Sequence, residues 1–255
     1  LLLLVCVFLL KMKTAISKPK NVPLVSIILC TYNRAHLLNH AIASVLTQSY
    51  RNWELIIIDD GSVDDTGSVV MPIVKSDPRI KFFYHANQGL ARSRNIGIAL
   101  ASGKYTTFID SDDEYRGNHL SIRVRAMERN PLLALIYGGI EYVGPVEKQY
   151  VPDAQRPGKK IHLRKCYAGG TFFARTSAFK KLNGFRNLPF AMDLDFIRRT
   201  HTKGLVIEKV KEPTYRYHLD ADHRLCDLYE RGGEKAIFEF QGGRTGLPGE
   251  LFGRS

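Results

Sequence analysis

The hydrophobic positions of the chain follow two periods, one typical of buried strands and one typical of helices. Residues 24–30 are apolar and rich in β-branched side chains, as expected of a strand that is covered on both faces. Over residues 37–46 apolar side chains recur every three or four positions, which predicts an amphipathic helix against a sheet. The succession of strand and helix then repeats. We therefore predict an α/β fold with a doubly wound, mainly parallel central sheet flanked by helices.

The same patterns set the bounds of the individual elements. We predict strands at 24–30, 55–58, 80–84, 105–109, 133–137 and 205–210, and helices at 37–46, 64–75, 89–101, 118–129 and 193–203. The helix at 64–75 is the least regular, because Gly67 and Pro72 interrupt it. Three prolines and a glycine predict a loop over residues 145–158, and the segment from Gly232 onward shows little periodicity.

The first ten residues are all apolar, but a helix that spans a membrane needs about 20 residues. A signal peptide carries its positive charges ahead of the apolar run, whereas Lys11 and Lys13 follow it. Met12 opens an ordinary polar leader. We therefore expect residues 1–11 to be translated upstream sequence rather than native protein, with a clipped membrane anchor as the alternative.

Charge and cysteine usage narrow the environment of the protein. The formal net charge of +12 favours a polyanionic partner, which includes nucleic acid, anionic lipid headgroups and a substrate that carries a diphosphate. The sequence contains no zinc-finger pattern and no aromatic and basic RNA-binding signature, so nucleic acid is not an expected partner. The four cysteines are widely spaced and form no C-x-x-C pair, which favours free thiols in a reducing compartment. We expect a cytoplasmic protein.

Polar side chains follow four of the predicted strands at their carboxyl ends. In open parallel sheets this edge is where ligands bind, because loops and helix N-termini converge there. The residues are Thr31, Tyr32 and Asn33 after the first strand, Asp59 and Asp60 after the second, Asn87 and Gln88 after the third, and Asp110, Asp112 and Asp113 after the fourth. Their coincidence at one edge predicts a single site to which four loops contribute.

The acidic cluster at residues 110–113 brings several carboxylates to the end of one strand. Carboxylate oxygens are the ligands that Mg²⁺ and Mn²⁺ prefer, and such sites keep open positions for water and substrate phosphate. The alternative is an acidic helix cap or a solvated turn, which accounts for most isolated D-x-D sequences.

Several ordered motifs give the chain a resemblance to a known family. They are VSIILCTYNR at 25–34, LIIIDDGS at 55–62, NQGLARSRNIG at 87–97, GKYTTFIDSDD at 103–113 and the Asp-Leu-Asp ending of 184–195. In this order and spacing the chain resembles a family 2 glycosyltransferase, whose GT-A fold is a nucleotide-sugar-binding α/β domain. The resemblance spans roughly residues 24–218.

The resemblance implies which parts of the chain bind the nucleotide, the metal ion and the acceptor. It implies one GT-A domain at 24–230, with a nucleotide-binding half at 24–117 and an acceptor half at 118–230, between a leader at 1–23 and an irregular tail at 231–255. The residues that it assigns to the nucleotide are Thr31, Tyr32, Asn33, Asp59, Asp60, Asn87, Arg94 and Asp110. It assigns Asp112 and His218 to a Mn²⁺ or Mg²⁺ ion. Asp193 matches the family's catalytic base, although Met192 stands where the family commonly has Glu.

The reaction implied by the resemblance is inverting transfer of a hexosyl or N-acetylhexosaminyl group (EC 2.4). The donor is expected to be a UDP-sugar and the acceptor a hydroxyl of a glycan or lipid-linked glycan, as in polysaccharide biosynthesis. The metal ion stabilises the leaving diphosphate while Asp193 removes the acceptor proton. The basic surface is compatible with peripheral attachment to the cytoplasmic face of a membrane.

Three other classes of protein compete with this interpretation. A sugar-1-phosphate nucleotidyltransferase needs a glycine-rich loop after the first strand, and residues 30–34 contain no glycine. A nucleic-acid-binding protein is suggested by charge alone. A noncatalytic module that binds nucleotide sugars or glycans stays open, because Met192 changes the surroundings of the expected base.

Overall fold

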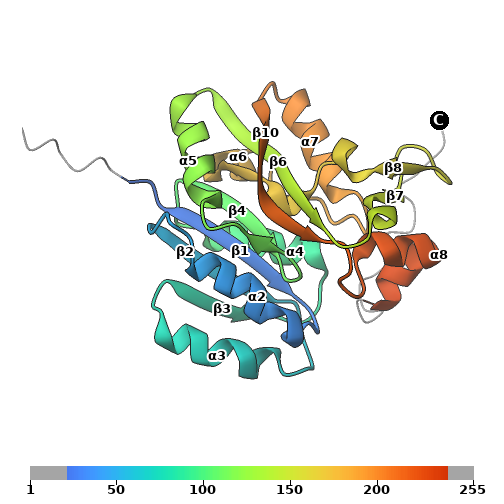
Figure 1. The fold of residues 1–255 in the computed structure, drawn as a ribbon, viewed down its shortest axis with the longest axis horizontal. Coiled ribbons are helices and arrows are strands. Elements are labelled where there is room, and N and C mark those ends of the chain that lie inside the picture. Colours follow the sequence, from blue (N-terminus) through green and yellow to red (C-terminus); the bar gives the residue numbers. More distant parts are fainter. Residues whose placement is uncertain (1–21, 241–255) are drawn as a thin grey trace, which may run out of the picture.

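The computed structural model describes residues 22–240, which form an eight-stranded mixed sheet and a separate two-stranded one (Figure 1). The order in the large sheet is β3-β2-β1-β4-β9-β6-β10-β5. Its strands are β1 (Val25–Thr31), β2 (Trp53–Asp59), β3 (Ile80–Tyr84), β4 (Tyr105–Asp110), β5 (Glu114–Tyr115), β6 (Leu133–Val143), β9 (Phe173–Arg175) and β10 (Val206–His218). The small sheet pairs β7 (Tyr150–Pro152) with β8 (Lys160–His162).

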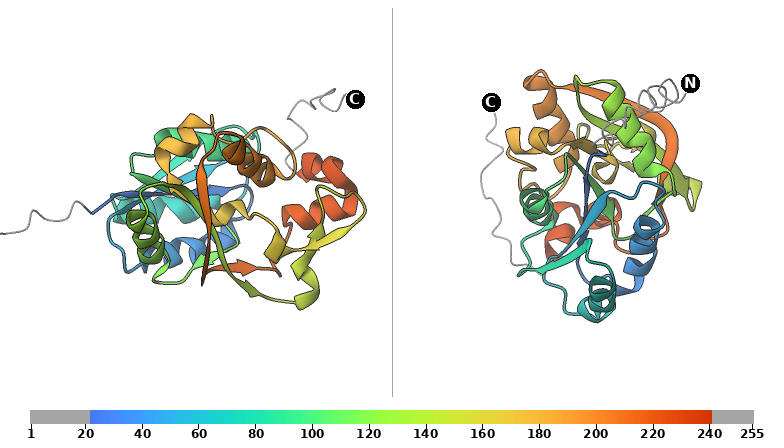
Figure 2. Two further views of the ribbon diagram at one scale, coloured as in Figure 1. Left: turned by 90° about the horizontal axis from the view of Figure 1, so that it is seen from above. Right: turned by 90° about the vertical axis from the view of Figure 1, so that its left-hand side faces the viewer.

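Helices cover both faces of the large sheet and enclose two hydrophobic clusters. The helices are α2 (Ala35–Leu46), α3 (Thr66–Ser76), α4 (Leu90–Leu100), α5 (His119–Arg129), α6 (Thr176–Lys181), α7 (Met192–Thr202) and α8 (Leu225–Phe240). The first cluster packs α2, α3 and α5 on one face, and the second packs α4, α6 and α7 on the other. Figure 2 shows α8 at one end of the molecule, beside the β7–β8 hairpin.

The pairing of the first strands brings the predicted polar residues together. β1 is parallel to both β2 and β4, and Thr31 pairs in register with Asp59 while Cys30 pairs with Asp110. Successive side chains of β1 enter opposite clusters, with Ile27 in the first and Ile28 in the second. Burial on both faces explains the continuous apolar run of this strand, and the shared register places its polar end beside those of β2 and β4.

The mainly parallel sheet with flanking helices is confirmed, although the second half of the chain modifies it. β9 lies antiparallel between β4 and β6, and β5 pairs antiparallel with the end of β10. β6 and β10 extend well beyond the predicted 133–137 and 205–210, because they pair with each other over most of their length. The predicted loop at 145–158 contains the 3₁₀ helix η1 (Val146–Gln149) and β7.

Two segments differ from their predicted local structure for identifiable reasons. α3 continues through Pro72, whose ring is exposed, as is Ser68 four residues earlier; water can therefore solvate the carbonyl that loses its partner. The predicted irregular tail is wrong over 231–240, which is helical in α8. The backbone is non-helical only at Gly232 and at Gly233, where φ is 63°. The leader at 1–21 and the tail at 241–255 lie outside the described residues.

Two further expectations concern thiols and membrane spans. Cys30, Cys166 and Cys226 are free, as expected, and Cys6 lies outside the described residues. Over residues 22–240, none of the helices combines the length and the apolar character that crossing a membrane requires.

Candidate functional site

A cavity of about 290 Å³ lies beyond the carboxyl ends of β1, β2 and β4. The second half of the chain closes it with residues that precede α7, with the β7–β8 hairpin and with α8. The predicted site residues that line it are Thr31, Tyr32, Asp60, Arg94, Asp110, Asp112 and Asp193. The site is therefore assembled from both halves of the chain.

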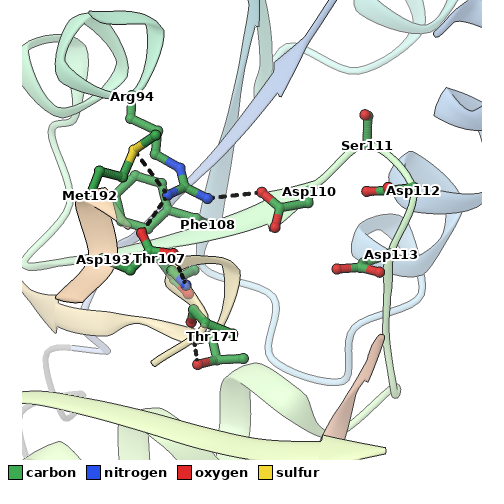
Figure 3. Close-up of polar contacts among 12 residues, drawn as sticks. Arg94, Thr107, Phe108, Asp110, Ser111, Asp112, Asp113, Thr171, Met192 and Asp193 are labelled. Atoms are coloured by element: carbon green, nitrogen blue, oxygen red, sulfur yellow. Dashed lines mark hydrogen bonds and ion pairs between the residues drawn. The ribbon is translucent and has the colours of Figure 1, made fainter. Parts of the chain in front are cut away.

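Arg94 on α4 links two carboxylates across this cavity (Figure 3). One terminal nitrogen donates to Asp110 Oδ1 at 3.0 Å and the other to Asp193 Oδ1 at 2.9 Å. The Arg94 side chain is 4% exposed. Burial alone would lower the pKa of Arg94, but the two carboxylates outweigh burial and raise it. The guanidinium is thus a fixed cation that holds both carboxylates in place.

The Gly169–Gly170 pair in the 3₁₀ helix η3 (Gly169–Thr171) allows this arrangement. The backbone N–H of Gly169 donates to Asp193 Oδ2 at 2.9 Å. A Cβ atom at Gly169 would lie 2.2 Å from Asp193 Oδ1, and one at Gly170 would lie 2.7 Å from Asp110 Oδ2. Only glycine fits at either position, because a Cβ atom would meet Asp193 and Arg94 at Gly169, and the Tyr215 hydroxyl and Asp110 at Gly170.

Asp193 reaches the cavity from the first turn of α7. Ala191, just before the helix, has a φ of 57°, a left-handed conformation that non-glycine residues seldom adopt. Met192 is buried, with its sulfur 3.8 Å from a terminal nitrogen of Arg94. Burial raises the pKa of Asp193, while Arg94 and the Gly169 N–H oppose that shift. A carboxylate held in this way can accept a proton from a hydroxyl beside it.

The turn after β4 carries two further aspartates with different partners. Asp112 Oδ2 accepts a hydrogen bond from Arg34 at 2.9 Å, and burial raises the pKa of Asp112 against the opposing effect of Arg34. Asp113 is buried and accepts from the Tyr215 hydroxyl at 2.7 Å and from the backbone N–H of His218 at 2.9 Å. Asp113 therefore ties the end of β10 to this turn, and both Asp112 and Asp113 line the cavity.

Four predicted site residues do not line the cavity. Asp59 Oδ1 accepts from the Ser62 N–H at 2.8 Å and Asn33 Oδ1 accepts from the Val63 N–H at 2.8 Å, so both stabilise the turn after β2. Asn87 has a buried side-chain amide with no hydrogen-bond partner. The His218 imidazole lies 3.5 Å from Glu114 and 3.8 Å from Asp220. The roles predicted for these four residues stay predictions.

Three contributors were missed by sequence reasoning. Arg34 belongs to the first motif, but the resemblance assigns it no role. Tyr215 lies inside a long strand, and Phe240 lies in the segment that the sequence predicts to be irregular. The Phe240 ring meets the edge of Tyr32, with ring centroids 5.9 Å apart. The position of Arg34 directly after Thr31, Tyr32 and Asn33, at the end of β1, was the available signal.

The acidic residues of the cavity fit a divalent cation in part. Within residues 22–240, no three side chains of His, Cys, Asp and Glu gather in a geometry that holds a metal ion. Asp110 and Asp112 nevertheless present carboxylate oxygens to the same cavity, and one or two such ligands suffice where water and substrate phosphate complete the shell. The donor set suits Mg²⁺ or Mn²⁺ bound together with a diphosphate.

Residues 26–187 match the family model described as glycosyl transferase family 2. The chain is 32% identical over 208 residues to the putative colanic acid biosynthesis glycosyl transferase WcaA of Escherichia coli, covering 79% of this chain and 74% of the relative. It is 36% identical over 167 residues to the Campylobacter jejuni GalNAc(5)-diNAcBac-PP-undecaprenol beta-1,3-glucosyltransferase, covering 62% of this chain and 52% of that protein.

The match to an uncharacterized glycosyltransferase of Haemophilus influenzae is 46% identical over 114 residues, or 44% of this chain. The chain spans 46% of the length of that relative.

Two groups of solved structures share the fold. The mannosyltransferase PcManGT of Pyrobaculum calidifontis, in complex with GDP-Man and Mn²⁺, has a TM-score of 0.62 at 18% identity, over 78% of this chain and 58% of that one. S. aureus TarS in complex with UDP-GlcNAc has a TM-score of 0.66 at 18% identity, over 86% and 65%. Both likenesses confirm the GT-A architecture.

Proposed function

The chain belongs to glycosyl transferase family 2 and is a glycosyltransferase of GT-A fold, and from this premise we propose that it is metal-dependent and inverting. The donor is a nucleotide-diphosphate sugar, with UDP as the favoured nucleotide. The acceptor is a hydroxyl of a glycan linked to a lipid diphosphate. The sugar transferred is a hexose or an N-acetylhexosamine.

The observation that carries this proposal is the placement of two differently supported carboxylates in one cavity. Asp112, with Asp110 beside it, lies on the turn after β4, and Asp193 lies at the start of α7. A cation held at Asp112 would neutralise the charge that develops on the departing diphosphate. Asp193, fixed by Arg94 and Gly169, accepts the proton of the acceptor hydroxyl. One displacement at the anomeric carbon inverts its configuration.

Tyr32 and Asp60 offer a place for the nucleotide. Both line the cavity at the carboxyl ends of β1 and β2. Asp60 Oδ1 accepts from the Gln88 N–H at 2.7 Å, and burial raises the pKa of Asp60. A carboxylate in this place can accept the imide hydrogen of uracil while the ring of Tyr32 packs against the base. These two groups support a uridine donor.

A second cavity supports an anionic acceptor. It measures about 540 Å³, lies between β6, β10 and the segment after β8, and shares Leu163, Cys166 and Ala168 with the first cavity. Its other walls include the basic side chains of Arg164, Lys209 and Lys211 and the rings of Tyr137 and Tyr142. Sugar rings stack well on aromatic side chains, and diphosphates pair with lysine and arginine. The C. jejuni relative, by its name, acts on such a lipid-linked diphosphate.

The proposal is tested by measuring donor binding and slow donor hydrolysis with UDP-, GDP- and dTDP-sugars, each with Mn²⁺, Mg²⁺ or EDTA. We expect one nucleoside diphosphate to be released only when metal is present. Asp112→Asn should abolish this release, whereas Asp65→Asn, at an exposed position that caps α3 without a side-chain hydrogen bond, should not.

Binding without turnover under every condition would favour the alternative of a noncatalytic nucleotide-sugar module. Met192 in the place of an acidic residue is the observation that keeps this alternative open.

A further inference from the structure

Arg34 joins the acidic turn after β4 to the C-terminal segment. One of its terminal nitrogens donates to Asp112 Oδ2 at 2.9 Å. The other donates to the backbone carbonyls of Asp222 and His223, at 3.3 Å and 2.7 Å. The two contacts are separated along the chain by more than a hundred residues, and a single planar guanidinium makes both. Arg34 therefore fixes the segment before α8 relative to Asp112.

The segment held by Arg34 continues into a wall of the cavity. Residues 222–240 include Leu225, Cys226 and Phe240, which line it. The Phe240 ring stacks on His223 with ring centroids 5.2 Å apart, and it also meets the edge of Tyr32. His223 has a φ of 56°, and the helix is interrupted at Gly232 and Gly233. The segment thus has backbone positions at which it can turn, and its tip covers a ring expected to meet the nucleobase.

A divalent cation and the Arg34 guanidinium compete for the same carboxylate. The Asp112 side chain is 11% exposed, so little solvent screens the repulsion between two cations placed on it. A cation on either oxygen of Asp112 is repelled by the guanidinium at Oδ2, so its binding weakens the Arg34 contact. Because the same guanidinium also holds the carbonyls of Asp222 and His223, its movement loosens the segment that follows.

We propose that Arg34 is a positioning residue that acts as an ionic latch: it holds residues 222–240 against the cavity until a divalent cation takes Asp112. The inference rests on the proposed metal dependence and adds a residue and a segment to it. Arrival of the cation with its diphosphate frees Tyr32 from Phe240 and frees Arg34, which lines the same cavity, to neutralise the diphosphate. Binding of the donor thereby opens the wall that covers the nucleotide side.

The test combines Mn²⁺ binding, followed by electron paramagnetic resonance, with hydrogen exchange of peptides from residues 222–240. In the unmodified protein we expect Mn²⁺ alone to speed exchange in this segment at least about fivefold, with no change in α5. Arg34→Gln removes the competing cation, so it should bind Mn²⁺ at least about tenfold more tightly. Its segment should exchange fast before any metal is added.

Two further variants separate the parts of the latch. Arg34→Lys keeps the charge but cannot reach the carboxylate and both carbonyls at once, so it should bind Mn²⁺ as the unmodified protein does while its segment exchanges fast. Arg92→Gln removes an exposed arginine of α4 and should change neither the Mn²⁺ affinity nor the hydrogen exchange of residues 222–240.

Mn²⁺ binding with unchanged exchange, or unchanged affinity in Arg34→Gln, would overturn the latch and leave the proposed transfer intact. Absence of Mn²⁺ binding in both proteins would overturn the latch and the metal dependence together.

Discussion

Two arginines of the acidic cavity differ in how firmly they are held. Arg94 is fixed between two carboxylates, whereas Arg34 can give up its single carboxylate partner. Arg94 is buried, and both of its terminal groups contact carboxylates, Asp110 and Asp193, against a floor of glycine backbone. Arg34 is 15% exposed and contacts one carboxylate, and its other terminal nitrogen donates hydrogen bonds to backbone carbonyls. Asp193, the expected base, is therefore held in place by Arg94. Asp112, the expected cation ligand, is neutralised by Arg34, which can move away.

The difference follows from what surrounds each pair. The Arg94 guanidinium is almost fully buried and both of its partners are carboxylates, so removing it leaves two carboxylates without their cation. Arg34 is more exposed than Arg94 and has only one carboxylate partner, so a cation that arrives with water and phosphate can take its place at Asp112. The two ion pairs are therefore distinguished by the exposure of the arginine and by the nature of its second partner, not by charge balance.

The largest expected effect comes from removing the fixed arginine. Arg94→Gln leaves Asp110 and Asp193 without their shared cation and should lower the free energy of unfolding by about 3 kcal/mol. Arg34→Gln, the matched change in the exchangeable pair, should lower it by less, about 1.5 kcal/mol, because only one carboxylate loses a charged hydrogen-bond donor. Urea unfolding of the two variants measures both losses of unfolding free energy. Equal losses would mean that Arg34 is held as firmly as Arg94 and would contradict the distinction between the two pairs.

The glycine floor should be nearly as sensitive. Gly169→Ala places a Cβ atom against Asp193 Oδ1 and the Arg94 guanidinium, so we expect a loss of about 2 kcal/mol in unfolding free energy and about a hundredfold in transfer rate. Gly67→Ala is the control, because nothing lies within 4 Å of its Cβ and α3 should gain about 0.5–1 kcal/mol. Thermal unfolding separates the two, and an unimpaired Gly169→Ala would show that the carboxylates can shift.

A smaller, pH-dependent effect is expected far from the cavity. Burial would raise the pKa of Glu54 in β2, but hydrogen bonds from Ser102, Lys81 and Ser26 outweigh it and lower the pKa to about 2. Since the folded pKa lies below the unfolded value, this stabilisation is complete above about pH 4.5 and is lost as pH falls towards 2.

Glu54→Gln should therefore lower the free energy of unfolding by about 1–2 kcal/mol at pH 7 and by much less near pH 2. Chemical denaturation at the two pH values checks this. A penalty that does not depend on pH would mean that the carboxylate charge is unimportant.

The sequence was most informative where structure is local. The ends of β1, β2 and β4 follow from hydrophobic runs, because each of these buried parallel strands is followed directly by the polar residues that it delivers to the sheet edge. Asp193 was identified through family resemblance. Its supports could not be predicted in the same way, because Arg94 and Gly169 are 99 and 24 residues away from it in the chain.

Several elements in the second half of the chain could not be predicted from the sequence, because they form only through tertiary contacts. β9 is only three residues long and exists as a strand because β4 and β6 flank it on both sides. α8 contains two adjacent glycines that break its pattern, yet Phe240 beyond them packs on Tyr32. Neither element has a periodicity that could be recognised without its neighbours.

The most direct test of the account compares Asp193→Asn with Asp195→Asn in metal-dependent sugar transfer to acceptors linked to a lipid diphosphate. Asp195 lies on the same helix but pairs with Arg199 and Arg186 instead of Arg94. We expect Asp193→Asn to bind the donor as tightly as the unmodified protein while transfer falls at least about a hundredfold, and Asp195→Asn to retain transfer. Transfer that persists in Asp193→Asn would remove Asp193 from the role of base and contradict the account.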